Sequence, residues 1–316
     1  MKIIVTGCAG FIGTNFVRYW LSEHPNDRVI GIDCLTYAAN AEALSELRGR
    51  EGFVFYKADI CDVTAMDEIF AKEKPDAVVN FAAESHVDRS ISDPSLFIRS
   101  NVVGTEVLLD ASLKHGVKRF HQISTDEVYG DLPLDSGELF TEEWRLCPSS
   151  PYSASKASAD LLVLSYYRTF GLSVTVSRAS NNYGYFQHPE KLIPKVISLA
   201  LAGKSIPIYG SGTNVRDWLY AMDHCRAVDL ILSSGRAGEI YNVGGGTLLS
   251  NLELVKKILS LLDASPELIS FVEDRKGHDR KYALSSEKLK RELLWSPATD
   301  FESGLCRTVE WYKNKS

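Results

Sequence analysis

The sequence predicts an α/β fold: a doubly wound parallel sheet with a smaller, irregular C-terminal substrate lobe. Short apolar segments rich in β-branched and aromatic residues alternate with longer segments of helical periodicity. Such alternation is typical of βαβ units, whose strands are covered on both faces. After about residue 180 the alternation breaks, and Gly, Asn, Tyr and Pro become frequent. The break indicates a second, less regular lobe.

The first part of the chain supplies the predicted sheet. Strands are predicted at 2–6, 28–33, 53–57, 76–81, 118–124 and 173–178. Helices are predicted near 11–24, 63–73, 95–114 and 152–170. Because crossovers between parallel strands are right-handed, these elements place helices on both faces of one sheet.

The second part contains fewer regular elements. They are expected at 190–202 (helix), 217–221 (strand), 222–234 (helix) and 239–243 (strand), followed by three glycines and three short helices. The alternation of 217–240 resembles that of the first part. We therefore expect a first domain at 1–180, a lobe mainly at 181–316, and re-entry of the chain into the first domain at about 217–240.

Composition excludes several classes of protein. The 316 residues are 45% hydrophobic and 24% charged, which excludes intrinsic disorder and fibrous proteins. The net charge of -6 gives no general attraction to nucleic acid or anionic membrane. The chain shows neither a signal peptide nor a bilayer-spanning apolar run, so we expect a soluble, cytoplasmic protein.

The six cysteines show no metal-binding or redox spacing. They are Cys8, Cys34, Cys61, Cys147, Cys225 and Cys306, and no two form a CxxC pair. We expect no metal site, and reduced, mostly buried thiols.

A glycine-rich turn follows the first predicted strand and precedes the first helix. Gly7, Gly10 and Gly13 allow a tight turn and a close approach of the backbone to a pyrophosphate at the helix N-terminus. Asp33 ends the second strand, 20 residues after Gly13, where a carboxylate can accept a hydrogen bond from a ribose hydroxyl. Asp59 follows the third strand. An ordinary strand–helix turn is the alternative, but together these features predict a Rossmann-like NAD site.

A Tyr-x-x-x-Lys pattern begins the helix predicted at 152–170. Tyr152 and Lys156 lie four residues apart and therefore share a helix face. A nearby ammonium lowers the pKa of a phenol and lets it exchange a proton near neutral pH. A surface Tyr and Lys would be the simpler interpretation of the pattern alone. Combined with the glycine turn, the pattern favours hydride transfer from an alcohol.

Several further motifs resemble the dTDP-glucose 4,6-dehydratases, a family of the extended short-chain dehydrogenase/reductase superfamily. The resemblance extends from residue 2 to about 312. The motifs are Phe81–Asp88, Ser124–Gly130, Ser180–Gly184, Glu190–Pro194 and Asn214–Trp218. The most specific of them is the triplet Thr125-Asp126-Glu127.

The resemblance implies a reaction in three steps. Carbon 4 of glucose is oxidised, water is eliminated across carbons 5 and 6, and the hydride returns to carbon 6. Tyr152 would remove the carbon-4 hydroxyl proton, Lys156 would lower its pKa, and Thr125 would hydrogen-bond the same hydroxyl. Asp126 would be the acid for the leaving hydroxyl and Glu127 the base at carbon 5, so Asp126 must hold its proton longer.

The resemblance also implies two sets of binding residues. NAD would contact Gly7, Gly10, Phe11, Ile12, Gly13, Asp33, Cys34, Leu35, Thr36, Asp59, Ile60, Phe81, Ala82, Ala83, Ser85, Ser100, Tyr152, Lys156 and Asn182. The nucleotide sugar would contact Ser85, His86, Thr125, Asn181, Lys191, Leu192, Pro207, Ile208, Tyr209, Arg216, Asn251, Arg275 and His278. Among the latter, the guanidinium of Arg216 best suits a diphosphate. His86 is equally well explained as a sugar neighbour or as a loop histidine.

Alternatives remain open at this point. The nucleotide is dTDP, UDP or CDP, and a 4-epimerase, a decarboxylase or a non-catalytic NAD-binding sensor could share the fold. A sensor needs none of Tyr152, Lys156, Asp126 and Glu127, all of which are present. Members of the superfamily commonly pair through two helices, so we expect a homodimer through 95–114 and the Tyr152-bearing helix.

Overall fold

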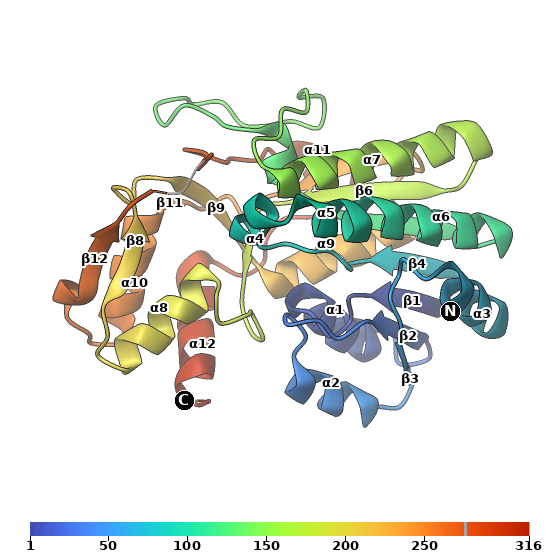
Figure 1. Cartoon of the computed structure of the whole chain (residues 1–316), viewed down its shortest axis with the longest axis horizontal. Coiled ribbons are helices and arrows are strands. Elements are labelled where there is room, and N and C mark those ends of the chain that lie inside the picture. Colours follow the sequence, from blue (N-terminus) through green and yellow to red (C-terminus); the bar gives the residue numbers. More distant parts are fainter. Residues whose placement is uncertain (275–276, 316) are drawn as a thin grey trace.

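A seven-stranded parallel sheet forms the centre of the computed structural model, which describes residues 1–274 and 277–315 (Figure 1). The strand order is β10-β6-β5-β4-β1-β2-β3. Its strands are β1 (Lys2–Thr6), β2 (Arg28–Asp33), β3 (Phe53–Lys57), β4 (Ala77–Asn80), β5 (Arg119–Thr125), β6 (Val174–Ala179) and β10 (Glu239–Val243). The doubly wound α/β prediction is confirmed, and every strand predicted in the first part of the chain is present.

Two apolar cores cover the two faces of this sheet. Neighbouring residues of a strand point to opposite faces, so Ile4 packs in one core while Ile3 and Val5 pack in the other. The first core lies under α3 (Val63–Glu73), α6 (Gly104–Lys114) and α7 (Pro151–Phe170). The second lies under α1 (Phe11–Glu23), α2 (Ala41–Arg48) and α9 (Ala221–Ser234). Burial on both faces explains the nearly continuous apolar strands.

The helix predicted at 95–114 is divided into three parts. It consists of α5 (Pro94–Phe97), a π-helical turn η1 (Ile98–Val103) and α6. Short helices α2 and α4 (Val87–Ser92) were not predicted. The turn η1 matters because π-helical turns are frequent at functional sites, and here Ser100 lines a cleft.

The C-terminal elements form two small sheets beside the large one (Figure 1). Their strands are β7 (Asn181–Tyr183), β9 (Val215–Tyr220) and β11 (Leu248–Ser250) in one sheet, and β8 (Ile206–Tyr209) and β12 (Ile269–Val272) in the other. Their helices are α8 (Leu192–Leu201), α10 (Asn251–Leu261), α11 (Glu287–Leu293) and α12 (Phe301–Lys313). Short turns η2 (Asp126–Tyr129) and η3 (Pro266–Leu268) complete the fold.

The return of the chain to the large sheet differs in detail from the prediction. β9, predicted at 217–221, pairs with β7 and β11 in a small sheet, whereas α9 and β10 join the large sheet and its core. Ser180 and Asp217 tie the segment after β10 to the small sheet by accepting from Gly245 N. The division into domains at residue 180 stays a prediction.

The cysteines are less buried than expected. All six thiols are free, and only Cys8 and Cys225 are buried, whereas Cys34 and Cys147 are exposed. The expectation of mostly buried thiols is wrong because these two lie in loops after β2 and before α7. No metal-binding group of side chains occurs within residues 1–274 and 277–315. No helix in the same residues is long and apolar enough to span a bilayer.

Candidate active site

The glycine turn after β1 packs directly against the end of β4. Gly7 has a φ of +64°, and a Cβ there would lie 2.7 Å from the backbone nitrogen of Ala82. A Cβ on Gly13 would lie 2.1 Å from the carbonyl oxygen of Gly7. Both positions therefore require glycine, because backbone atoms cannot move aside as a flexible side chain could. The turn leaves the first amides of α1 at the carboxyl edge of the sheet.

Asp33 closes the turn from the neighbouring strand. Its carboxylate accepts from the backbone nitrogens of Ala9 at 3.0 Å and Leu35 at 2.8 Å. Burial raises the pKa of Asp33, and these two hydrogen bonds oppose that shift. The carboxylate is thereby fixed at the rim of a cleft between β1, β2 and β4.

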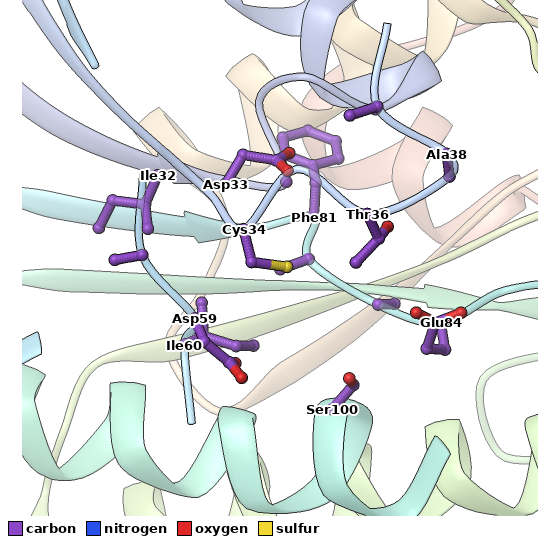
Figure 2. A pocket seen from close by; sticks show the side chains of 16 residues that line it. Ile32, Asp33, Cys34, Thr36, Ala38, Asp59, Ile60, Phe81, Glu84 and Ser100 are labelled. Carbon is purple, nitrogen blue, oxygen red and sulfur yellow. The ribbon is translucent and has the colours of Figure 1, made fainter. Parts of the chain in front are cut away.

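The cleft contains most residues predicted to bind a dinucleotide. It has a volume of about 100 Å³ and is lined by Gly7, Gly10, Asp33, Cys34, Thr36, Asp59, Ile60, Phe81, Ala82, Ala83 and Ser100 from the predicted set. Figure 2 shows Ser100 on the helix that borders the cleft, with its hydroxyl pointing toward the other lining side chains. Leu35 is the exception: its amide braces Asp33, but it lines none of the cavities described here.

A second cavity continues from the cleft toward the Tyr152-bearing helix. Its volume is about 190 Å³. Its lining includes six more of the predicted cofactor residues, namely Phe11, Ile12, Gly13, Ser85, Tyr152 and Lys156, and it shares Gly7 and Gly10 with the cleft. The structure therefore places the glycine turn and the Tyr-x-x-x-Lys pair on one continuous surface.

Tyr152 and Lys156 are both buried at the start of α7. A capping box between Ser150 and Ser153 begins the helix and fixes this first turn. Lys156 Nζ donates to the carbonyl oxygen of Ile123 at 2.6 Å. Burial lowers the pKa of Lys156 to about 8, and the charge of Asp160 opposes this shift.

The phenol of Tyr152 does not have the lowered pKa that the sequence predicts. Burial raises the pKa of Tyr152, the charge of Glu127 raises it further, and a hydrogen bond with Thr125 opposes both. The expectation considered only the cation at Lys156 and missed the cost of forming a phenolate in a buried, carboxylate-rich site.

The triplet Thr125-Asp126-Glu127 lies where β5 ends and η2 begins. Thr125 Oγ1 donates to Asp126 Oδ1 at 3.2 Å and accepts from the Glu127 amide at 3.3 Å. Asp126 is only 2% exposed, and its Oδ2 is buried without a hydrogen-bond partner among the described residues. Burial raises the pKa of Asp126 well above its ordinary value, and the charges of Glu127 and Asp217 add to this. The direction agrees with the proton-holding role predicted for Asp126.

The triplet and Tyr152 line a third cavity, of about 180 Å³. Asn181 and Asn182 of β7, together with Ser85 and Lys191, complete its predicted lining. Phe11, Ile12 and Tyr152 also line the second cavity, and Glu127 and Asn181 also line a larger groove. The third cavity therefore lies between the cofactor cleft and the groove.

The groove brings together the predicted nucleotide-sugar residues. Its volume is about 580 Å³. It is lined by Ser85, His86, Asn181, Lys191, Leu192, Pro207, Ile208, Tyr209, Arg216, Asn251 and His278 from the predicted set. Thr125 lies in the third cavity instead, and Arg275 falls outside the described residues. Segments far apart in the sequence thus converge on one groove.

The polar side chains of the groove already have protein partners. Arg216 donates to the carbonyl oxygens of Val215 at 2.8 Å and Asp279 at 3.0 Å, and its guanidinium lies 4.3 Å from the ring centroid of Tyr282. Lys191 Nζ donates to the Ser85 carbonyl oxygen at 3.0 Å. Backbone carbonyl oxygens therefore help to orient both cations in the groove.

Several lining residues escaped the sequence interpretation. They are Tyr37, Glu84, Ser124, Gln187, His224 and Tyr282. Glu84 and Ser124 lie inside motifs that the sequence does single out, at the ends of β4 and β5, so their position was a usable signal. His224 and Tyr282 reach the site only through tertiary packing of α9 and the loop before α11.

Comparison with known proteins identifies the relatives of this chain. Residues 4–308 match the family model described as GDP-mannose 4,6 dehydratase. The chain is 51% identical to dTDP-glucose 4,6-dehydratase 1 of Escherichia coli (strain K12), over 99% of this chain and 92% of that protein. It is 50% identical to the dTDP-glucose 4,6-dehydratase of Streptomyces griseus, over 98% of this chain and 93% of the relative.

Solved structures agree with the sequence relatives. The crystal structure of DesIV, a dTDP-glucose 4,6-dehydratase from Streptomyces venezuelae with NAD and TYD bound, has a TM-score of 0.96 and 47% identity, over 99% of this chain and 97% of the other. The crystal structure of UDP-glucose 4-epimerase with UDP-glucose, from Thermotoga maritima, has a TM-score of 0.92 and 32% identity, over 100% of this chain and 99% of the other. The fold is shared by both enzymes, but identity is higher to the dehydratase. The chain therefore belongs to the dTDP-glucose 4,6-dehydratase family.

Proposed function

We propose that this chain converts dTDP-glucose to dTDP-4-keto-6-deoxyglucose, as an NAD-dependent hydro-lyase. The observation that carries the proposal is the cavity that Tyr152, Asp126 and Glu127 line together. It adjoins both the glycine-turn cleft and the groove that contains Arg216. The proposed base for the carbon-4 hydroxyl, Tyr152, and the proposed acid–base pair for elimination, Asp126 and Glu127, thus line the same cavity.

The residues present fit NAD. The close backbone contacts at Gly7 and Gly13 keep the turn before α1 tight, as a pyrophosphate-binding turn requires, and the Asp33 carboxylate suits a ribose diol while repelling a 2′-phosphate. Gly10, Asp33, Asp59 and Ser100 would hold the adenosine half, with Phe11, Ile12 and Lys156 beside the nicotinamide. When bound, NAD supplies a hydride acceptor for carbon 4 and a hydride donor for carbon 6.

Tyr152, assisted by Lys156, removes the proton of the carbon-4 hydroxyl. With a pKa of about 8, Lys156 keeps its positive charge at pH 7 and stabilises negative charge developing on the Tyr152 oxygen. Tyr152 must first release its own proton to solvent, and its phenolate then takes up the proton of the carbon-4 hydroxyl; the raised pKa makes that phenolate a strong base. Thr125 orients the same hydroxyl from β5.

Asp126 and Glu127 perform the elimination. The carbon-4 ketone acidifies the hydrogen on carbon 5, which Glu127 removes as a proton. Asp126, protonated because of its burial and its carboxylate neighbours, gives its proton to the departing carbon-6 hydroxyl, which leaves as water. Two adjacent carboxyl groups can thus act as base and acid because their surroundings differ.

Product formation tests this function. Purified protein given dTDP-glucose should form the 4-keto-6-deoxy sugar without added reductant, and deuterium placed at carbon 4 should reappear at carbon 6. Parallel reactions with UDP-glucose and CDP-glucose measure the nucleotide preference. If none of the three sugars gives product, the proposal is overturned. Turnover of UDP-galactose without dehydration would instead make the chain an epimerase.

We also propose a cytoplasmic homodimer that pairs through α6 and α7. Figure 1 shows these helices side by side on one face of the sheet. Exposed apolar side chains lie on this pair and on η1, with Ile98 47%, Leu161 60% and Phe170 54% exposed. Apolar patches of this kind are typical of interfaces. Light scattering at micromolar concentration should give twice the mass of 35.1 kDa, and a monomer mass would contradict the dimer.

A further inference from the structure

Two buried hydrogen-bond acceptors in the central cavity have no role in the chemistry above. His224, on the first turn of α9, and Gln187, in the loop before α8, both line the cavity that contains Tyr152. The Nε2 atom of His224 and the Oε1 atom of Gln187 are buried, and within the described part of the chain neither has a hydrogen-bond partner. Buried polar atoms are nearly always paired, so these two call for a partner from outside the protein, either a ligand or a water molecule.

Asn182 fixes both side chains in these orientations. Its amide nitrogen donates to the Ser180 carbonyl oxygen at 2.9 Å, so its Oδ1 faces His224 Nδ1, also at 2.9 Å. The Asn182 carbonyl oxygen accepts from Gln187 Nε2 at 3.0 Å. Asn182 thus contacts His224 through its side chain and Gln187 through its backbone, and so positions both neighbours.

The missing partner must be a hydrogen-bond donor. An oxygen at Asn182 requires His224 Nδ1 to carry the proton, which leaves a lone pair on Nε2. Burial lowers the pKa of His224 to about 4, so the ring is neutral at pH 7. Gln187 Oε1 is an acceptor because the nitrogen of the same amide is used. The cavity therefore offers two acceptors from the β7–α9 side.

We infer that His224 and Gln187 bind the carboxamide nitrogen of the nicotinamide and thereby fix which face of the ring meets the sugar. A primary carboxamide carries two N–H donors, which matches two acceptors. Phe11 and Ile12 supply an apolar wall of the same cavity, and both also line the cavity next to the glycine turn. The inference rests on the proposed NAD-dependent function and assigns a subsite within it.

A competition between two dinucleotides tests the subsite. Purified protein is equilibrated with mixtures of NAD and acetylpyridine adenine dinucleotide, in which a methyl group replaces the amide nitrogen. The ratio bound is measured after gel filtration. Wild-type protein should prefer NAD roughly tenfold, because the analogue leaves two buried acceptors unpaired.

The variants Gln187→Met and His224→Leu should each reduce that preference at least threefold, since one acceptor is then gone. Gln187 is only partly buried, so its variant remains informative if His224→Leu fails to fold. The matched control is His24→Leu, because His24 pairs with Asp229 at the far end of α1. An unchanged preference in both variants would overturn the subsite, as expected if water occupies it. Failure of wild-type protein to bind either dinucleotide would instead overturn the proposed function.

Discussion

The cofactor cleft and the nucleotide-sugar groove are built in opposite ways. The cleft depends on the backbone. Gly7 follows β1, Gly13 lies in the first turn of α1 and Asp33 ends β2, and these residues shape the cleft through close approaches and amide contacts. The groove depends on side chains from separate segments, such as Lys191 and Arg216, which already donate to carbonyl oxygens of the protein. A change in the cleft should therefore abolish binding, whereas a change in the groove should weaken it by degrees.

The largest loss of turnover is expected at Asp126, in the third cavity, where the cleft and the groove meet. Asp126→Asn removes the acid that protonates the leaving hydroxyl, and we expect turnover to fall about 1,000-fold. Oxidation at carbon 4 should survive, measured as transfer of a carbon-4 label from the sugar to the bound nucleotide. Because the pKa of Asp126 is raised, wild-type turnover should decline as pH rises through it, and this alkaline limb should vanish in the variant.

Asp135→Asn is the control for this substitution, since Asp135 is an exposed acid in the loop after η2. Turnover of Asp126→Asn within threefold of wild type would remove Asp126 from the mechanism. Loss of carbon-4 oxidation as well would instead indicate that Asp126 orients the sugar.

A single substitution in the cleft should remove most of its affinity for NAD. Gly13→Ala places a Cβ against the Gly7 carbonyl oxygen, so the turn must shift, and we expect NAD affinity to fall about 100-fold. Nucleotide retained per chain after gel filtration measures the loss. Gly137→Ala is the control, because a Cβ there meets no atom within 4 Å. Normal nucleotide content in Gly13→Ala would refute the claim that backbone shape selects the cofactor.

A single substitution in the groove should weaken binding of the nucleotide sugar without abolishing it. Arg216→Lys keeps the charge but loses the planar fork that reaches two carbonyl oxygens, and we expect KM for the nucleotide sugar to rise about tenfold with kcat nearly unchanged. Bound NAD should stay at the wild-type level. Arg226→Lys, on the exposed side of α9, is the matched control. A fall in kcat with unchanged KM would place Arg216 in the chemical steps.

The same contrast explains how much the sequence could predict. Strands β1 to β6 and the glycine turn follow from local patterns, since a strand covered on both faces needs continuous apolar residues and a close backbone approach needs glycine. The split of the helix at 95–114 was not predictable, because the π-helical turn η1 is stabilised by tertiary contacts. Buried Asn101 in that turn donates to the Glu84 carbonyl oxygen at 3.0 Å and to Ser155 Oγ at 2.8 Å.

Electrostatic properties were the least accessible to prediction. Spacing alone places Tyr152 beside Lys156, but the direction of the Tyr152 pKa shift depends on burial and on Glu127. His224 reaches the site from α9, and nothing in its neighbouring sequence indicates a partner on β7. Residues that act through their surroundings therefore required the structure.

The smallest effect is expected at Glu190, which joins the two regions. It lies 3.3 Å from Arg89 Nη2 and 3.5 Å from His86 Nε2, and all three side chains are partly exposed. Burial and then the charge of Lys191 lower the pKa of His86, while Asp88 and Glu190 oppose this shift. Glu190→Gln removes one opposing charge, so the pKa of His86 should fall further, by less than one unit.

KM should rise no more than about threefold, because exposed ion pairs contribute little. An NMR titration of the His86 ring measures the pKa directly. Glu138→Gln is the control, because Glu138 is an exposed acid that is distant from His86 and Glu190 in the sequence. A rise in the His86 pKa would mean that Glu190 does not act on His86 through its charge. A large loss of bound NAD would mean that the two regions are coupled through this contact, and the contrast between an all-or-none cleft and a graded groove would no longer hold.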